Sequence, residues 1–181
     1  APVTVIITAA GEVSDVKDIV SPVLVHERNS YIYYIDFSFD SFKLGGSAFA
    51  QQLNKLGDEV PTVVDSEYFA DAFNAVQDAI AKHLILAGHD ISAGGMITTL
   101  LEMCFANVEG GLEVNLDKLA EKDIVKILFA ENPGILVQVK DHKAFEKLML
   151  DAGVGFAVVA RPTSERHILV SKEGIQYHLG I

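Results

Sequence analysis

The fold of this chain is decided by the stretch Leu84-Ile85-Leu86-Ala87-Gly88-His89-Asp90-Ile91-Ser92-Ala93-Gly94-Gly95. Residues 84–88 are apolar and end in glycine, which is typical of a buried strand. Residues 96–107 then carry apolar side chains at helical spacing. The stretch therefore predicts a strand that passes into an amphipathic helix through a short turn, residues 89–95.

This turn is rich in residues that could contact a ligand. Asp90 and Ser92 are both suited to cap the helix, because a side-chain oxygen there can accept a hydrogen bond from a first-turn N–H. Gly94 and Gly95 lack a Cβ, so we expect room for a bulky group. A helix start favours anions, and a carboxylate beside it can hold a Mg²⁺ that bridges to phosphate. His89 could reach that phosphate or simply pack at the strand end.

A second turn repeats this arrangement. Leu44-Gly45-Gly46-Ser47-Ala48-Phe49-Ala50-Gln51 places two glycines and a serine at a predicted helix start. A serine cap with small neighbours is more often structural than ligand-binding, but two such turns in one domain suggest a shared ligand. Glu131 could orient that ligand, although an acidic residue close to Pro-Gly usually lies in a solvated turn.

Composition limits the class of protein. The chain has 181 residues, half of them hydrophobic, and a net charge of −11. This length suits one domain, residues 1–181, and no apolar run approaches the roughly 18 residues that a membrane span needs. The negative charge would repel a nucleic acid, whereas backbone N–H groups and a metal could still bind a single nucleotide. The start has no signal-peptide pattern, and we expect a piece of a longer chain.

Other kinds of site find little support. The single cysteine, Cys104, lies in mid-helix where core packing is expected, and one cysteine excludes an internal disulfide and suits a reducing cytosol. No two of the six histidines have the i, i+4 spacing of a helical zinc site. The sequence has no Walker A motif, nucleophilic serine elbow or dinucleotide fingerprint.

The order of predicted elements favours an α+β fold, with a mixed sheet and helices packed on it. We expect the last three strands to form an antiparallel meander. The predicted strands are residues 3–9, 31–37, 84–88, 112–116, 134–139, 155–160, 166–171 and 175–179. The predicted helices are residues 47–56, 66–83, 96–107, 123–129 and 143–152.

Taken in order, these motifs resemble one family across nearly the whole chain. The resemblance is carried by residues 44–51, 56–58, 87–95, 99–106 and 128–134. It is to the large-type phosphoribosylformylglycinamidine synthases of purine biosynthesis, in particular to the second of their two AIR-synthetase-type C-terminal domains. The chain departs from the family at Ala93, where an acid is common, and at Asn132-Pro133, which replaces an acidic-apolar pair.

The resemblance implies a three-layer α/β/α sandwich with ferredoxin-like character. Such enzymes use ATP and Mg²⁺ to activate the amide oxygen of formylglycinamide ribonucleotide, and ammonia from glutamine then displaces phosphate. By analogy Asp90 would be a Mg²⁺ ligand and Ser92 a nucleotide contact, with Gly94 and Gly95 giving room for the ATP or ADP. In this second half the nucleotide site would be the auxiliary one.

The resemblance also implies partners outside this chain. The main ATP-binding domain and the glutaminase domain, with its nucleophilic cysteine, would belong to the same cytoplasmic full-length enzyme, so the isolated chain is expected to be inactive. Two alternatives stay open: a non-catalytic scaffold, and another AIR-synthetase-like enzyme such as a kinase or hydrogenase-maturation factor. A nucleotide site predicts that Asp90 and Ser92 face an open cleft, whereas a scaffold predicts that they are buried caps.

Overall fold

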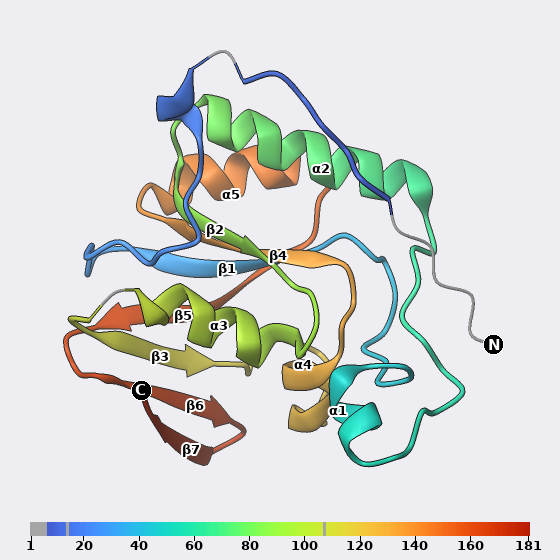
Figure 1. Cartoon of the computed structure of the whole chain (residues 1–181). Coiled ribbons are helices and arrows are strands. Elements are labelled where there is room, and N and C mark those ends of the chain that lie inside the picture. The colour runs from blue at the N-terminus through green and yellow to red at the C-terminus, as the bar shows by residue number, and fades with distance from the viewer. Residues whose placement is uncertain (1–6, 14, 107) are drawn as a thin grey trace.

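The computed structural model describes residues 7–13, 15–106 and 108–181 and contains one seven-stranded mixed sheet (Figure 1). The strand order is β2-β4-β1-β5-β3-β6-β7. Neighbouring strands are antiparallel, except that β3 and β6 are parallel. The strands are β1 Tyr31–Asp36, β2 Ile85–Asp90, β3 Gly111–Asn115, β4 Gly134–Val139, β5 Phe156–Thr163, β6 His167–Lys172 and β7 Ile175–Gly180.

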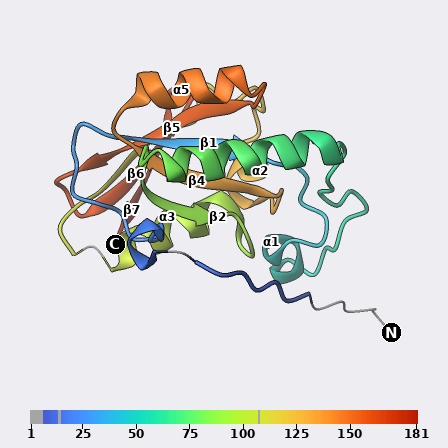
Figure 2. The ribbon, with the colours of Figure 1, turned by 90° about the horizontal axis from the view of Figure 1, so that it is seen from above.

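Helices cover both faces of the sheet (Figures 1 and 2). Helices α2 (Ser66–Ala81) and α5 (His142–Asp151) pack on the face of β2, β4, β1 and β5, and α3 (Gly95–Phe105) and α4 (Ile124–Phe129) pack on the opposite face. The short helix α1 (Ala48–Gln52) and a 3-10 helix, Val16–Asp18, lie outside these layers. The expected α/β/α sandwich is therefore confirmed. Within the described residues, no helix combines the length and the apolar character needed to cross a membrane.

Strand β1 shows why the sheet needs two helical layers. Ile32 and Tyr34 point into the core below α3 and α4, whereas Tyr33 and Ile35 point into the core below α2 and α5. All four side chains are buried. A strand that is buried on both faces has an unbroken apolar sequence rather than an alternating one, which accounts for the run of residues 32–35.

The expected meander at the end of the chain is wrong. β5 and β6 are not neighbours, because β3 lies between them. β3 pairs antiparallel with β5 and parallel with β6, for example Leu112 with Ile168. Only the hairpin of β6 and β7 is as expected, and its turn has positive φ at Glu173 and Gly174. Apolar side chains of β3 and β6 share one core, but a hydrophobic pattern does not say which strands are neighbours.

Two further predicted elements need correction. The helix at 47–56 is shorter, since α1 ends at Gln52 and the backbone reaches a φ of 53° at Asn54. Of the strand at 3–9, residues 3–6 lie outside the described residues, and residues 7–9 form no strand, with Ile7 85% exposed. The remaining predicted elements are present, with ends that differ by a few residues.

Helix α3 begins directly against the last turn of α4. A Cβ at Gly95 would stand 2.7 Å from the carbonyl oxygen of Leu128 and 2.8 Å from that of Ala130, and one at Gly94 would stand 2.2 Å from Oγ1 of Thr98. Both glycines have positive φ, 92° at Gly94 and 73° at Gly95. The expectation that these glycines leave room for a ligand is therefore wrong, because protein atoms fill that space.

We predict that Gly95→Ala lowers the free energy of unfolding by about 2–4 kcal/mol, because the new methyl group meets the backbone of α4 and the residue keeps an unfavourable φ. Gly153→Ala is the matched control. Gly153 has a φ of 69°, and a Cβ at this position would have no atom within 4 Å, so this change should cost only about 1 kcal/mol. Urea unfolding of both variants checks this, and equal losses would contradict it.

We also predict that Cys104 is inert in the folded chain. Burial raises the pKa of its thiol from 9.0 to about 11, with Arg166 acting weakly in the opposite direction. At pH 8 its reaction with a thiol reagent should be at least roughly a hundredfold slower than in the urea-unfolded chain. The thiol also contributes stability that is present below pH 9 and is lost as the pH rises toward 11. Equal reaction rates in the two states would contradict this.

Candidate functional site

Three loops meet at the end of the sheet where β1 and β2 end and β4 begins. Asp36 at the end of β1 pairs with Gly134 at the start of β4, and Asp90 at the end of β2 pairs with Ile135. The loop after β1, the turn from β2 into α3 and the segment from α4 into β4 therefore lie side by side (Figure 1). The site residues predicted from the sequence all belong to this region.

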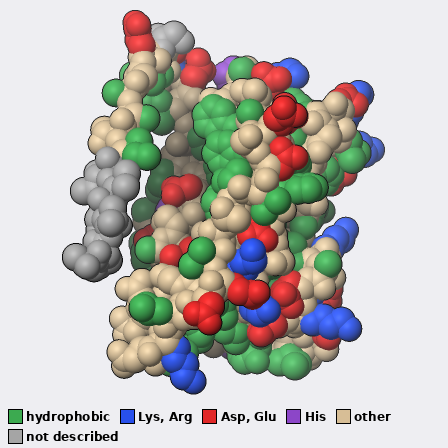
Figure 3. All heavy atoms as spheres, turned by 90° about the vertical axis from the view of Figure 1, so that its right-hand side faces the viewer, with side chains coloured by type: hydrophobic (Ala, Val, Ile, Leu, Met, Phe, Trp, Pro, Cys, Tyr) green, Lys and Arg blue, Asp and Glu red, His purple; other side chains and the backbone are tan. Residues whose placement is uncertain are grey.

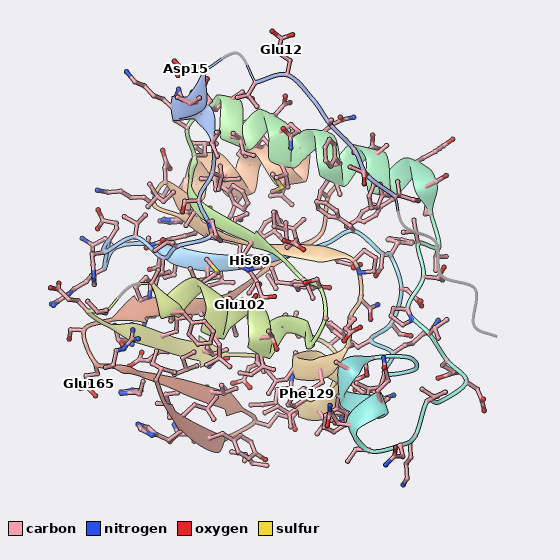
Figure 4. All side chains as sticks on the ribbon, in the orientation of Figure 1. Glu12, Asp15, His89, Glu102, Phe129 and Glu165 are labelled. Carbon is pink, nitrogen blue, oxygen red and sulfur yellow. The ribbon has the colours of Figure 1, made fainter. Side chains whose placement is uncertain are left out.

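Asp90 is exposed at the last position of β2. Its side chain is 75% exposed, and its Oδ1 lies 3.4 Å from Nδ1 of His89. The other ring nitrogen of His89, Nε2, lies 3.0 Å from Oε2 of Glu102 on α3, and Figure 4 shows the two side chains close together. His89 therefore joins the strand end to α3, which is the packed position that the sequence left open as one alternative.

A hollow of about 360 Å³ adjoins Asp90 on the side of α2. His89 and Asp90 supply its charged and titratable groups, and its other walls are mainly apolar. In Figure 3 the surface is hollowed beside the N-terminal segment, with hydrophobic and acidic side chains around it. The apolar walls come from Val20, Pro22, Val76, Ile80, Ile85, Ile135 and Val137. Asp90 thus lines open space and is not a buried cap, whereas Ser92, Gly94 and Gly95 do not line this hollow.

The prediction that Asp90 or Ser92 caps α3 is wrong. The N-cap residue is Gly94, and no side chain makes the capping hydrogen bond. Ser92 is exposed, and its carbonyl oxygen accepts a hydrogen bond of 3.0 Å from the N–H of Gly95. Thr99 Oγ1 donates to the carbonyl of Asp90 at 3.1 Å. A side-chain cap needs an extended residue before the helix, whereas this turn passes through positive φ to bring α3 against α4.

The turn at Gly45-Gly46-Ser47 is closed by its own backbone. Ser47 caps α1, since its Oγ accepts from the N–H of Ala50 at 3.2 Å and donates to the carbonyl of Leu44 at 2.7 Å. The N–H groups of residues 45, 46 and 47 donate to the carbonyls of residues 59, 56 and 44. The structural interpretation of this serine is confirmed, and these N–H groups are not available to a phosphate.

Glu131 connects the two glycine turns. Its Oε1 accepts one hydrogen bond of 2.8 Å from the N–H of Gly94 and another of 2.8 Å from the N–H of Ala48. The ring of Phe129, labelled in Figure 4, stacks on Phe49 at 4.6 Å between ring centroids and holds α4 against α1. The solvated-turn interpretation of Glu131 is therefore wrong. The two turns do share an anion, but it is a carboxylate of this chain.

Asn132 anchors the loop after β1. Only 2% exposed, it accepts from the N–H of Lys43 at 3.2 Å and donates to Oγ of Ser38 and to the carbonyl of Ser41. In this loop the Lys43 ammonium, 2.7 Å from Asp40, lowers the pKa of that carboxyl. In the sequence Asn132 stands out only as a departure from the family pattern. Its buried amide satisfies both backbone and side-chain groups of the loop, as buried polar groups generally require.

The described residues contain no group of three or more His, Cys, Asp or Glu side chains placed to hold a metal ion. Asp90 would therefore supply a single carboxylate to a Mg²⁺ ion. Such a ligand set fits Mg²⁺, which commonly keeps several water ligands and is held by one or two carboxylates together with substrate phosphates. It does not fit a closed structural metal centre.

Comparisons with known proteins agree with this architecture. Residues 39–172 match the family model of the C-terminal domain of AIR synthase related proteins. Human phosphoribosylformylglycinamidine synthase is 35% identical over 157 residues, which cover 85% of this chain but 12% of the human protein. The chain therefore spans about one eighth of that relative.

Two solved structures share the fold. PurL of T. maritima, in a complex with ATP, superposes with a TM-score of 0.70 at 16% identity, covering 91% of this chain and 27% of that chain. The hydrogenase maturation protein HypE superposes with a TM-score of 0.55 at 13% identity, covering 84% of this chain and 52% of that chain. Since the family model covers most of the chain, the chain belongs to the AIR synthase related proteins, as their C-terminal domain.

Proposed function

We propose that residues 1–181 form one domain of a large-type phosphoribosylformylglycinamidine synthase. The observation that carries this proposal is the 35% identity to the human enzyme, which extends over 157 residues. The full-length enzyme would convert formylglycinamide ribonucleotide, ATP and glutamine into the amidine in the cytoplasm. Because the chain covers 12% of the human protein, its main ATP-binding domain and its glutaminase domain would be further parts of the same polypeptide.

Within that enzyme, this domain would contribute to an auxiliary Mg²⁺-nucleotide site at the turn from β2 into α3. Asp90 would bind Mg²⁺ and Ser92 would face an ATP or ADP, while Gly94 and Gly95 would set the close packing of the turn. The exposure of Asp90 and Ser92 supports these roles. Bound there, the metal ion would neutralise phosphate charge; the protein's part is to hold Asp90 on the strand end.

Two alternatives can be weighed against this proposal. A scaffold domain would explain the packed glycines, but it predicts buried caps at Asp90 and Ser92, and both residues are exposed. A role like that of HypE is supported by the fold at a TM-score of 0.55, whereas the synthase is supported by sequence identity. The solved complexes of T. maritima PurL with ATP and with formylglycinamide ribonucleotide also favour the synthase.

Asp90→Asn in the full-length enzyme tests the metal role. We expect the purified variant to retain at least roughly tenfold less ADP and Mg²⁺, because an amide oxygen carries no charge to bind the metal. The control is Asp71→Asn on the exposed face of α2, which should retain both. Nucleotide analysis by chromatography and metal analysis by mass spectrometry check this. Undiminished ADP and Mg²⁺ in Asp90→Asn would remove the support for this site.

The chain on its own should not catalyse the synthase reaction. Within the described residues its one cysteine is buried with a raised pKa, so we expect no glutamine hydrolysis by a thiolate. The assay supplies formylglycinamide ribonucleotide, ATP and Mg²⁺ with either glutamine or ammonium, and follows the amidine product. Product formation above the enzyme-free background with either nitrogen source would refute this prediction.

A further inference from the structure

Two histidines meet on the hairpin of β6 and β7, away from the candidate site. His167 is the first residue of β6, and His178 lies within β7. Their ring centroids are 4.6 Å apart, and the ring planes differ by 37°. The register of the sheet explains this contact, because His178 pairs with Leu169, two residues beyond His167. The two histidines are therefore diagonal neighbours with their side chains on one face.

This face of the hairpin is open to solvent. Ile168 and Val170, which alternate with His167 and Leu169, are buried in the core below α3 and α4. The histidines therefore face the other side, where α2 and α5 pack against β2, β4, β1 and β5, away from β6 and β7 (Figure 1). His178 is exposed, and both rings line a surface hollow of about 580 Å³. The hollow leaves room for an ion and water molecules beside the rings.

A carboxylate lies beside one of the rings. Glu165, labelled in Figure 4, comes from the turn before β6, and its Oε2 is 3.4 Å from Nδ1 of His167. A carboxylate there favours the tautomer with the proton on Nδ1, which leaves the lone pair of Nε2 to a metal ion. The hollow is also lined by Arg28, Glu113 and Arg161. Nε of Arg161 donates to Oε2 of Glu113 at 2.6 Å, which offsets its charge.

We propose that His167 and His178 bind one divalent transition-metal ion, Ni²⁺ or Cu²⁺, and that Glu165 positions the His167 ring. With metal–nitrogen bonds of about 2.1 Å, two imidazoles at a right angle on one ion have centroids about 4.5 Å apart, and two at the tetrahedral angle about 5.2 Å apart. The observed 4.6 Å matches the right angle of tetragonal Ni²⁺ and Cu²⁺ sites. The soft χ2 torsions allow the rings to turn their nitrogens toward the ion.

The ion is held in an open site. Since the described residues contain no cluster of three or more His, Cys, Asp or Glu ligands, water completes its coordination. The ion links the edge of the sheet to its neighbour, because β6 is the strand beside β7 in the sheet order and the residues of β7 are mostly exposed. The site shares no residue with the turn from β2 into α3, so it does not depend on the proposed function.

Histidine footprinting of the untagged full-length enzyme tests this site. Diethyl pyrocarbonate modifies imidazoles that have a free nitrogen, and peptide mass spectrometry gives the rate for each histidine. We expect Ni²⁺ to slow the modification of His167 and His178 at least roughly tenfold, with one half-saturating concentration for both. His83 and His142, which are exposed, are internal controls and should keep their rates. Mg²⁺ should protect neither pair, because it prefers oxygen ligands.

Two variants at exposed positions complete the test. In His178→Ala, Ni²⁺ should no longer protect His167, because a single imidazole holds the ion too weakly. In Glu165→Gln, the half-saturating Ni²⁺ concentration should rise about tenfold, as it does when a ligand loses its hydrogen-bond partner. Glu173→Gln, in the exposed hairpin turn, removes the same charge and should leave that concentration unchanged.

Each result decides one part of the inference. Full protection of His167 in His178→Ala, or protection of His83 equal to that of the pair, would overturn the shared site. Absence of protection in the wild type would overturn it as well. Equal half-saturating concentrations in Glu165→Gln and Glu173→Gln would remove Glu165 from the site.

Discussion

The arrangement of this domain depends on one close approach, that of the first turn of α3 to the last turn of α4. The two backbones can touch only because residue 95 has no side chain, and the contact places the chain after α4 beside the start of α3. Glu131, two residues beyond Phe129, then lies within reach of the Gly94 N–H. From there its Oε1 also reaches α1, so one contact between helices sets the positions of three loops at the end of the sheet.

The sequence predicted which segments form strands and helices better than it predicted which strands lie next to each other in the sheet. The apolar run of β1 and the periodicity of α2 follow from local geometry, because the period of side chains along a strand or helix depends only on its backbone. The position of β3 between β5 and β6 does not follow from local geometry. Leu112 and Ile168 face the same core, and several strand orders would bury them equally well, so the order is decided by the chain connections and not by the pattern.

In the candidate site, too, the sequence predicted local features but not the long-range contacts. Asp90 and Ser92 were predicted from the types of residue at a strand-to-helix turn, and the structure places both of them in the open. Their capping role was wrong because a local rule was applied where a distant residue competes: the N–H of Gly94 is satisfied by Glu131, 37 positions away. A signal for this existed, since two glycine turns and one acidic residue flanked by helix and Pro-Gly appeared together, but only the fold shows that they meet.

The acidic character of the chain also affects how a single phosphate could be bound. A net charge of −11 argues against long phosphate polymers, and the same charge makes any single phosphate costly to hold unless donors or cations compensate it. Many phosphate sites compensate with free N–H groups at a helix start. Here the N–H groups of residues 94 and 95 are bonded within the chain, to Glu131 and to the carbonyl of Ser92, so these two donors are not available to a phosphate. The packing of Gly95 against α4 thus leaves the exposed side chains of Asp90 and Ser92, and not the N–H groups of residues 94 and 95, open to solvent at the end of β2.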